Sequence, residues 1–347
     1  MARRPHARPR GASLVNTKFF VVLPESWHIE RMTSLRNGVY GAIPRELLEV
    51  PPGSVQCSPQ TPGAEVLESW PDASSNGFII HAPPSTIERR SVLALALRAL
   101  GPDAPLIALA ANAKGGTRLA DELEAFGCVI ETSHKRRHQI VTTIKPATPI
   151  GIEDAIAAAA PRLLPDLELW SQPGLFNWDS IDPGSKLLLD HLPPLTGSGA
   201  DLGCGIGVLA RAIHHKNPAA NITLIDIDQR AVAMARRNVP GDVIKTLWTD
   251  VRTARDLPNG LDFVVTNPPF HDAGNEDKSL GQAFITQAAR MLKPGGTLWL
   301  TANRHLPYEA TLRAHFGTIE NIADAHGYKI VAAKTALKPA AANKAHK

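Results

Sequence analysis

The sequence has 347 residues, of which 44% are hydrophobic and 20% are charged, with a formal net charge of +4. This composition is typical of a globular protein and excludes a largely disordered chain, while the length favours two domains. Three widely spaced cysteines without a CxxC pair, and histidines without ligand spacing, predict neither a disulfide framework nor a metal site. No apolar run reaches the roughly 18 residues of a membrane span. We therefore expect a cytoplasmic protein that acts without a membrane.

Both ends of the chain are basic. Residues 1–24 carry five Lys and Arg residues and no acid, and the chain after Asp324 carries five lysines and no acid. Such segments suit a polyanion such as RNA, because each neutralised phosphate releases counterions. A solvated tail without a partner explains each of them equally well. We expect a flexible basic arm over 1–18 and a basic tail over 337–347.

The sequence contains an internal repeat. Residues 51–76, which precede the first copy, are rich in Pro, Ser and Gly and are expected to form a loop inside the first domain. Segments 82–127 and 267–317 match in order at offsets of 185 to 192 residues. Each copy predicts a strand, a helix, a Gly/Pro turn, a second strand and a second helix, which is the pattern of a doubly wound α/β sheet. The matched pairs are Pro83-Pro84 with Pro268-Pro269, Leu100-Gly101-Pro102 with Leu292-Lys293-Pro294, Ala111-Asn112 with Ala302-Asn303, Phe126-Gly127 with Phe316-Gly317, and Ile140-Val141 with Ile330-Val331.

The second copy predicts particular elements. They are strands over 261–266 and 297–302, helices over 282–292 and 307–316, and a turn over 293–296. Three prolines within 158–173 indicate a helix-poor junction between the halves.

A glycine-rich turn, Asp201-Leu202-Gly203-Cys204-Gly205-Ile206-Gly207, connects a short predicted strand to a helix over 208–216. Glycines at such a turn let the backbone approach a bound nucleoside, because they carry no Cβ. The turn fits a nicotinamide-dependent enzyme as well as a methyltransferase, and a tight turn without a ligand remains open at this point.

Acids follow the next two predicted strands. The strand over 222–225 leads into Asp226, where a carboxylate can accept both hydroxyls of a ribose, and Asp228 is expected to cap the helix over 229–238. The strand over 243–249 leads into Asp250, which suits an adenine amine or is a solvated turn residue. With the adjacent Ile227 and Val251, these acids complete our candidate cofactor site.

The tetrapeptide Asn267-Pro268-Pro269-Phe270 directly follows the apolar strand over 261–266. The exocyclic amine of a base is a poor nucleophile because its lone pair is delocalised into the ring. Asn267 Oδ1 and the Pro268 carbonyl can accept the two amine hydrogens and draw the nitrogen towards sp³ geometry, while Phe270 stacks on a flipped-out base. We therefore predict Asn267, Pro268 and Phe270 as catalytic residues, with Asn267 also at the cofactor.

From Leu169 onward the sequence resembles the bacterial ribosomal RNA guanine-N2-methyltransferases, particularly the small-subunit enzymes. The resemblance implies that Phe176 packs near S-adenosylmethionine, that Asp201, Gly203 and Gly205 line its methionine end, and that Asp226 holds its ribose. The matching stretches are Pro173 to Phe176, Asp182 to Leu189, Asp201 to Leu209, Asn267 to Asp272, Ala302-Asn303 and Leu306 to Tyr308.

The resemblance also implies two tandem class I (Rossmann-like) methyltransferase domains of the α/β class, the N-terminal one degenerate. Its equivalent of the catalytic loop, over residues 81–85, lacks both the asparagine and the aromatic residue. We expect this first domain over 19–160, for RNA recognition or bracing, and a catalytic domain over 164–336.

The expected reaction is transfer of a methyl group from S-adenosylmethionine to the N2 amine of a guanine in ribosomal RNA, in the small subunit, by a monomer. Methylation of another base amine or of a protein amide remains an alternative, as does a non-catalytic RNA-binding assembly factor.

Overall fold

The computed structural model describes residues 36–269, 271–272, 275–276 and 278–337. Phe270, the basic arm and nearly all of the basic tail therefore lie outside the described residues. From Leu35 onward the chain forms one compact unit, which contains two large sheets.

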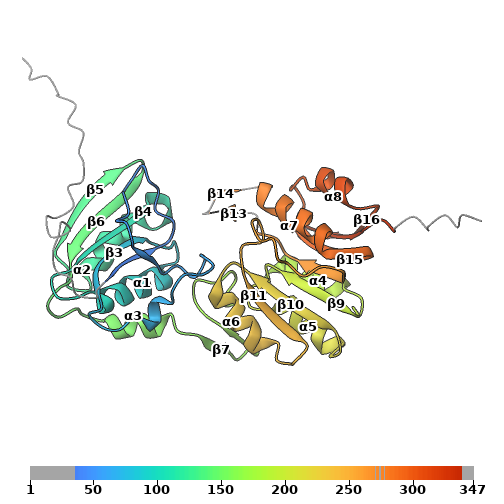
Figure 1. Cartoon of the computed structure of the whole chain (residues 1–347), viewed down its shortest axis with the longest axis horizontal. Helices are drawn as coiled ribbons and strands as arrows, with labels where there is room; N and C mark the ends of the chain where they lie inside the picture. Colours follow the sequence, from blue (N-terminus) through green and yellow to red (C-terminus); the bar gives the residue numbers. More distant parts are fainter. Residues whose placement is uncertain (1–35, 270, 273–274, 277, 338–347) are drawn as a thin grey trace, which may run out of the picture. The chain divides into compact units, whose positions relative to one another are not determined.

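The first sheet has six strands in the order β2-β1-β3-β4-β6-β5 (Figure 1). Strands β2, β1, β3 and β4 are parallel, whereas β6 runs opposite to them and pairs antiparallel with both β4 and β5. The elements are β1 (Arg36–Tyr40), β2 (Val55–Gln56), β3 (Ser75–His81), α1 (Thr86–Ala99), β4 (Pro105–Ala111), α2 (Leu119–Glu124), β5 (Ile130–Lys135), β6 (His138–Ile144) and α3 (Ile152–Ala158), with single 3-10 turns at Leu67–Ser69, Asn112–Lys114 and Gly116–Arg118.

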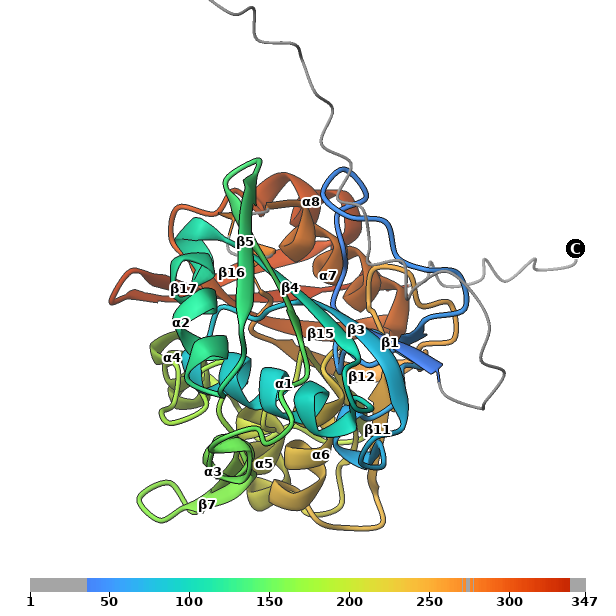
Figure 2. The same cartoon turned by 90° about the vertical axis from the view of Figure 1, so that its left-hand side faces the viewer.

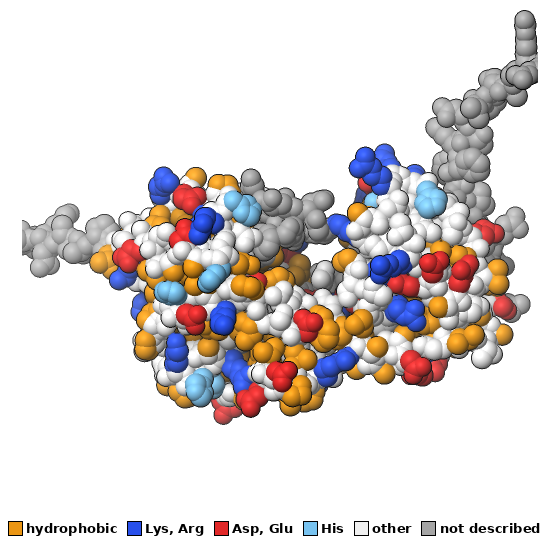
Figure 3. All heavy atoms as spheres, turned by 180° about the vertical axis from the view of Figure 1, so that it is seen from behind, with side chains coloured by type: hydrophobic (Ala, Val, Ile, Leu, Met, Phe, Trp, Pro, Cys, Tyr) orange, Lys and Arg blue, Asp and Glu red, His pale blue; other side chains and the backbone are white. Residues whose placement is uncertain are grey.

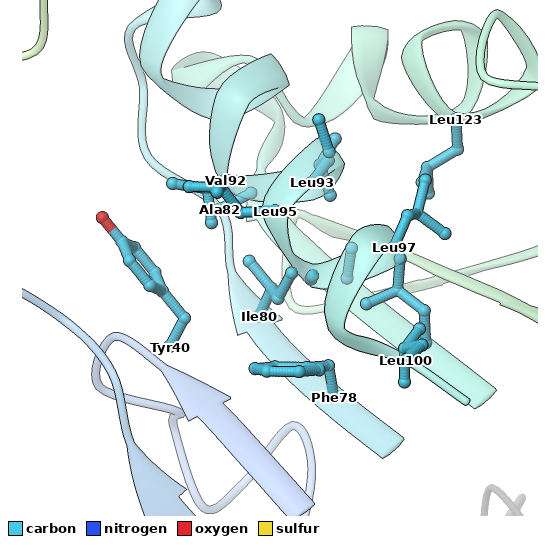
Figure 4. Close-up of a cluster of buried hydrophobic side chains, with 14 of the residues drawn as sticks. Tyr40, Phe78, Ile80, Ala82, Val92, Leu93, Leu95, Leu97, Leu100 and Leu123 are labelled. Carbon is cyan, nitrogen blue, oxygen red and sulfur yellow. The ribbon is translucent and has the colours of Figure 1, made fainter. Parts of the chain in front are cut away.

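Helix α1 forms the centre of the first core. Leu93 and Leu97 of α1 are fully buried, as are Phe78 and Ile80 of β3 (Figure 4). Helix α3 packs beside α1 and adds Ala155 to the same cluster (Figure 2). Burial of these apolar side chains explains why the first domain, in which we expect no catalysis, still folds as a sheet with helices.

The second sheet has seven strands in the order β11-β10-β9-β12-β15-β17-β16, of which β17 alone runs opposite to the others and pairs antiparallel with both β15 and β16. A hairpin of β7 (Arg162–Leu164) and β8 (Leu169–Ser171) precedes it. The elements are α4 (Pro183–His191), β9 (Ser198–Leu202), α5 (Val208–Lys216), β10 (Asn221–Asp226), α6 (Gln229–Asn238), β11 (Ile244–Trp248), β12 (Leu261–Thr266), β13 (His271–Asp272), β14 (Asn275–Glu276), α7 (Lys278–Met291), β15 (Leu292–Asn303), α8 (Glu309–His315), β16 (Thr318–Ala325) and β17 (Tyr328–Lys334).

Two apolar clusters cover opposite faces of the second sheet. Helices α4, α5 and α6 contribute to one cluster, and α7 and α8 contribute to the other (Figure 1). Strand β9 is short, as predicted, yet it lies at the centre and pairs with β10 on one side and β12 on the other. The strand order reverses at this point, so the carboxyl ends of these strands form the crevice in which such sheets bind ligands.

Three predicted elements differ in extent from the structure. Helix α7 begins at Lys278, four residues before the predicted start, and α8 is shorter than predicted at both ends. The predicted turn over 293–296 lies inside β15, where it interrupts the pairing with β12: Leu292 pairs with Leu261, and the next pair is Thr297 with Phe263. Gly295 has a φ of 81°, so the Pro-Gly-Gly segment keeps its turn-like geometry within the strand.

The two sheets are built alike, and their backbone pairing corrects part of the sequence alignment. Helices α1 and α7 both have 14 residues, and the residue after each pairs with the first residue of the preceding strand: Leu100 with Ser75, and Leu292 with Leu261. Counting along β3 and β12 from these pairs places His81 at the position of Asn267. The Pro-Pro pairs are therefore displaced by one residue.

The remaining matches follow the same register. Ile140-Val141 does correspond to Ile330-Val331, as predicted, whereas Ala111 corresponds to Asn303 and not to Ala302. On the neighbouring strands, Gly38 pairs with Phe78 and Ala200 pairs with Val264, which places Val39 at the position of Asp201. The first domain thus lacks both the carboxylate and the amide, and in this sense it is degenerate.

Candidate functional site

A pocket lies at the carboxyl ends of the central strands of the second sheet. Five of the predicted site residues line it: Phe176, Asp201, Gly203, Gly205 and Asn267. Its other lining residues are Asn177, Ser180, Asp182, Ser185, Cys204, Ile206, Val208 and Leu209. The phenyl ring of Phe176 is exposed, and this residue stands where a bound nucleoside can cover it.

The glycine-rich turn brings its backbone against β10. Gly203 N and Cys204 N both donate to Ile225 O, at 2.8 and 3.0 Å. Gly203 and Gly205 have φ of 74° and 52°, in the left-handed region that favours glycine. Gly207 differs in role: a Cβ there would lie 3.1 Å from Ala235, so this glycine permits α5 to pack on α6 and does not line the pocket.

Asp201 is the most deeply buried polar group of the pocket. Its Oδ2 accepts a hydrogen bond from Ala210 N at 3.1 Å, whereas its Oδ1 has no hydrogen-bond partner within the described part of the chain. Burial, opposed by the Ala210 hydrogen bond and reinforced by the nearby Asp226, raises the pKa of the carboxyl to about 7. A buried carboxylate oxygen without a partner fits a cationic group of a ligand.

Asp226 ties the glycine-rich turn to the next strand. Its carboxylate accepts from Gly205 N and from Asp228 N, each at 2.9 Å. Burial raises the pKa of Asp226 to about 6, although these hydrogen bonds oppose the shift. Asp228 caps α6 as predicted, because its Oδ1 accepts from Arg230 N at 2.9 Å.

Residues that the sequence analysis did not single out contact the segment that follows Asp226. The guanidinium of Arg230 forms ion pairs with Asp228 at 2.7 Å and with Glu88 of α1 at 2.8 Å. The carbonyl of Pro59 accepts hydrogen bonds from Gln229 N and from Trp248 Nε1, at 2.9 and 3.1 Å. Residues of the first half of the chain therefore contact the segment that follows Asp226.

Asp250 and Val251 do not line the pocket. Partial burial would raise the pKa of Asp250, but its hydrogen bonds to Arg252 outweigh burial and lower it. Val251 is buried in the apolar core, and its carbonyl accepts from Gln287 Nε2 at 3.0 Å. The backbone of Ile227 is also engaged, since its carbonyl accepts from Trp248 Nε1 at 2.8 Å. Their contact with a cofactor stays a prediction.

Asn267 stands directly after β12, where Thr266 anchors the strand end through a 2.6 Å hydrogen bond from its Oγ1 to Leu202 O. The side-chain amide of Asn267 donates from Nδ2 to Asp182 Oδ2 at 2.8 Å and to Ser185 Oγ at 2.9 Å. Pro268 is buried. Sequence reasoning did not assign Asp182 and Ser185, although the Asp-Pro-Gly-Ser start of α4 is a clear capping signal.

A second hollow of about 490 Å³ lies in the first domain, between Asp72, Arg98, Lys145 and the start of α3. Its cations are already committed, because Lys145 Nζ donates to Arg98 O and Leu100 O and Arg98 pairs with Asp72. It is therefore not our candidate. Among the described residues, no cluster of three His, Cys, Asp or Glu side chains could hold a metal, and no helix is long and apolar enough to cross a membrane.

The strand order, the central crevice and the placement of Asp201 beside the loop of Asn267 define the C-terminal half as a Rossmann-like methyltransferase domain. The family model described as "Methyltransferase small domain" matches residues 166–332. Among solved structures, a T. thermophilus 16S rRNA N2 methyltransferase in complex with AdoMet and guanosine has a TM-score of 0.71 at 22% identity, over 89% of this chain and 90% of that one.

Curated relatives identify the family. A ribosomal RNA small subunit methyltransferase C from Shewanella amazonensis is 31% identical over 271 residues, which is 76% of this chain and 78% of that protein. One from Pseudomonas paraeruginosa is 32% identical over 264 residues, which is 72% of this chain and 77% of that protein. The chain belongs to the ribosomal RNA small subunit methyltransferase C family.

Proposed function

We propose that the chain transfers a methyl group from S-adenosylmethionine to the N2 amine of a guanine in 16S ribosomal RNA. The observation that carries this proposal is the fixed amide of Asn267 at the edge of a pocket that contains the unpartnered Oδ1 of Asp201. The amide supplies an acceptor for an amine, and the carboxylate supplies an acceptor for a cation. The named relatives methylate small-subunit ribosomal RNA, and the T. thermophilus enzyme of similar fold contains guanosine, which supports a ribosomal guanine as the substrate.

The residues of the pocket fit S-adenosylmethionine. Asp201 Oδ1 would accept a hydrogen bond from the ammonium of its methionine part, and the absence of Cβ atoms at Gly203 and Gly205 leaves room for the backbone to approach it. Asp226, at the end of the neighbouring strand, would accept the ribose hydroxyls. When bound, the cofactor supplies an electrophilic methyl group on a sulfonium.

The chain's own residues activate and orient the guanine amine. Asn267 Oδ1 and the Pro268 carbonyl accept its two hydrogens, which weakens conjugation of the lone pair with the ring and points it away from these acceptors. With S-adenosylmethionine bound, its methyl group would pass to N2 as the sulfur–carbon bond breaks, and one amine proton would pass to water. Preorganised acceptors of this kind lower the barrier because they need no reorganisation in the transition state.

Substrate recognition is divided between the halves in our proposal. Charges on the face shown in Figure 3 alternate in sign, without a single basic patch among the described residues there. We infer that RNA contacts come from several small sites, among them Arg136 and Arg137 at the β5–β6 turn. The first domain, over 19–160, would grip RNA and brace the catalytic domain, over 164–336. We also infer a cytoplasmic monomer.

Nucleoside analysis tests the function directly. The purified protein is incubated with methyl-labelled S-adenosylmethionine and either 16S ribosomal RNA or small subunits prepared from cells that lack the gene, and the digested RNA is examined by mass spectrometry. We expect labelled N2-methylguanosine at one site. A labelled methyladenosine or a labelled protein would support one of the alternative substrates, and cofactor binding without any labelled product would support an assembly factor.

A further inference from the structure

Two residues at the start of α4 hold the side-chain amide of Asn267 through hydrogen bonds. Both hydrogens of its Nδ2 have acceptors, Asp182 Oδ2 at 2.8 Å and Ser185 Oγ at 2.9 Å. Asp182 and Ser185 are themselves buried and line the same pocket. These two residues lie more than 80 positions before Asn267 in the sequence, so only the fold brings them together.

This contact decides which end of the amide faces the pocket. An ionised carboxylate can only accept hydrogen bonds, so the atom of Asn267 next to Asp182 must be the nitrogen. Oδ1 then lies at the opposite end of the amide. In the flipped orientation Oδ1 would face a carboxylate, and the NH₂ group would face the amine of the substrate, donor against donor.

The contact with Asn267 is rigid because the same residues form the start of α4. Asp182 caps the helix, since the same Oδ2 accepts from Ser185 N at 2.8 Å, and Pro183 occupies the first turn. A side chain at Gly184 would meet the ring of Tyr328 at 2.6 Å and Asp182 Oδ2 at 3.0 Å, so only glycine leaves the carboxylate in place. The helix is anchored by the fully buried Leu188.

We propose that Asp182 and Ser185 are positioning residues that hold Asn267 with Oδ1 turned towards the reacting amine, an inference that rests on the proposed methylation. They act through Asn267 and touch neither the amine nor the methyl group. Their removal lets the amide rotate, so that a smaller fraction of molecules presents the acceptor. The expected consequence is a lower kcat with little change in the affinity for S-adenosylmethionine.

A charge exchange between the two positions provides the most specific test. Asn267→Asp places a second carboxylate against Asp182, and we expect a loss of roughly 100-fold or more in kcat from the repulsion. Adding Asp182→Asn places an amide donor at position 182 opposite the carboxylate introduced at position 267, which exchanges the two roles. The double variant should have a kcat at least roughly tenfold higher than that of Asn267→Asp. In the wild type one atom, Asp182 Oδ2, accepts from both Ser185 N and Asn267 Nδ2, so the NH₂ group of Asp182→Asn reaches position 267 at the expense of the bond to Ser185 N. The Tm of each variant is therefore measured to separate the weakened cap from the restored contact.

Single variants separate positioning from helix stability. Ser185→Ala keeps the backbone cap and removes one acceptor, and kcat should fall by roughly 5- to 20-fold with a cofactor Kd within about twofold of the wild type. Asp190→Asn, on the exposed side of the same helix, is the control and should change neither quantity. The proposal is overturned if the double variant recovers nothing, or if Ser185→Ala weakens cofactor binding as much as it slows turnover.

A measurement without substrate keeps this inference separate from the proposed function. In asparagine-labelled protein the side-chain NH₂ of Asn267, identified by its absence from Asn267→Asp, should exchange with solvent roughly tenfold faster in Ser185→Ala than in the wild type. Equal exchange rates in Ser185→Ala and the wild type would refute the positioning of Asn267, whatever the substrate is. Slow exchange in a wild-type protein that does not methylate guanine would refute the function and leave the positioning of Asn267 standing.

Discussion

We expect Asp201 to make cofactor binding depend on pH just below neutrality. The carboxyl is buried and unpartnered at Oδ1, and its pKa in the free protein is raised to about 7. We expect it to bind the cofactor ammonium in its ionised form, and this ammonium is already at least about five sixths charged at pH 7 because an α-amine has a pKa of about 7.7–8.0. Affinity should therefore fall as the pH falls through 7, while the amine opposes the change by only about 1.2-fold.

The magnitude follows from the two raised pKa values. The ionised fraction of Asp201 falls from about one half at pH 7 to about one tenth at pH 6, which raises Kd about fivefold. The ionised fraction of Asp226, which has a pKa of about 6, falls from about nine tenths at pH 7 to about one half at pH 6. This change raises Kd by a further factor of about two. Together Kd should rise about tenfold, and at pH 6.5 binding should release about one proton.

Calorimetry measures both quantities. Titrations of S-adenosylmethionine at pH 6, 6.5 and 7, each in two buffers of different ionisation enthalpy, give Kd and the number of protons released. Asp201→Asn should bind more weakly throughout and retain only the twofold dependence due to Asp226. A flat Kd between pH 6 and 7, or an unchanged slope in Asp201→Asn, would show that Asp201 does not hold the ammonium.

Four further outcomes are expected. Asn267→Ala should lower kcat by roughly 10²–10³ with nearly unchanged cofactor affinity in calorimetry, since it removes one preorganised acceptor. Asp201→Asn should raise the Tm of the free protein at pH 8 in calorimetric scans, because folding costs on the order of 1–4 kcal/mol to keep this buried carboxyl ionised above its pKa. Glu88→Gln should not lower the free energy of unfolding in denaturant titrations, because burial disfavours the charged carboxyl more than Arg230 favours it, but it should weaken cofactor binding a few-fold, whereas Glu65→Gln at an exposed ion pair should leave cofactor binding unchanged. A folded fragment that begins at Leu164 should bind the cofactor but methylate its substrate far more slowly, with a smaller salt dependence; equal rates would exclude a role of the first domain in recognition.

Local sequence patterns predicted the elements around the pocket well. Helices α5 and α6 have the predicted bounds, because a glycine turn and an aspartate cap mark their starts. Strand β12 likewise ends where an apolar run meets Asn267. In such segments the local signal and the final fold agree, so the sequence is sufficient.

The rest depended on contacts that are distant in the sequence. No spacing rule connects Asp182 to Asn267, and none connects Glu88 to Arg230. The alignment of the repeats failed at the Pro-Pro pairs for a related reason, since residue identity suggested one register and strand pairing imposed another. What brings these residues together is the order of strands in the sheet, which a linear pattern does not contain.

Adjacent residues of α1 make contacts that support the expected bracing role of the first domain. Arg89 is fully buried, forms a 2.7 Å ion pair with Glu122, and donates to the carbonyls of Pro83 and Pro84. In the first domain the buried guanidinium binds two carbonyls of the corresponding loop, which stand at the positions of Pro269 and Phe270, one and two residues beyond the carbonyl proposed for the amine. These hydrogen bonds and the ion pair with Glu122 hold the loop in place.

Glu88 lies next to Arg89 on α1 and pairs with Arg230, which holds Asp228 and, through its backbone, Asp226. Burial raises the pKa of Glu88, although Arg230 opposes the shift. Neighbouring residues of α1 thus contact both the loop of the first domain and the segment that follows Asp226. We therefore expect the first domain to influence how tightly its neighbour holds the cofactor, and Glu88→Gln compared with Glu65→Gln separates this influence from RNA binding because neither measurement contains RNA.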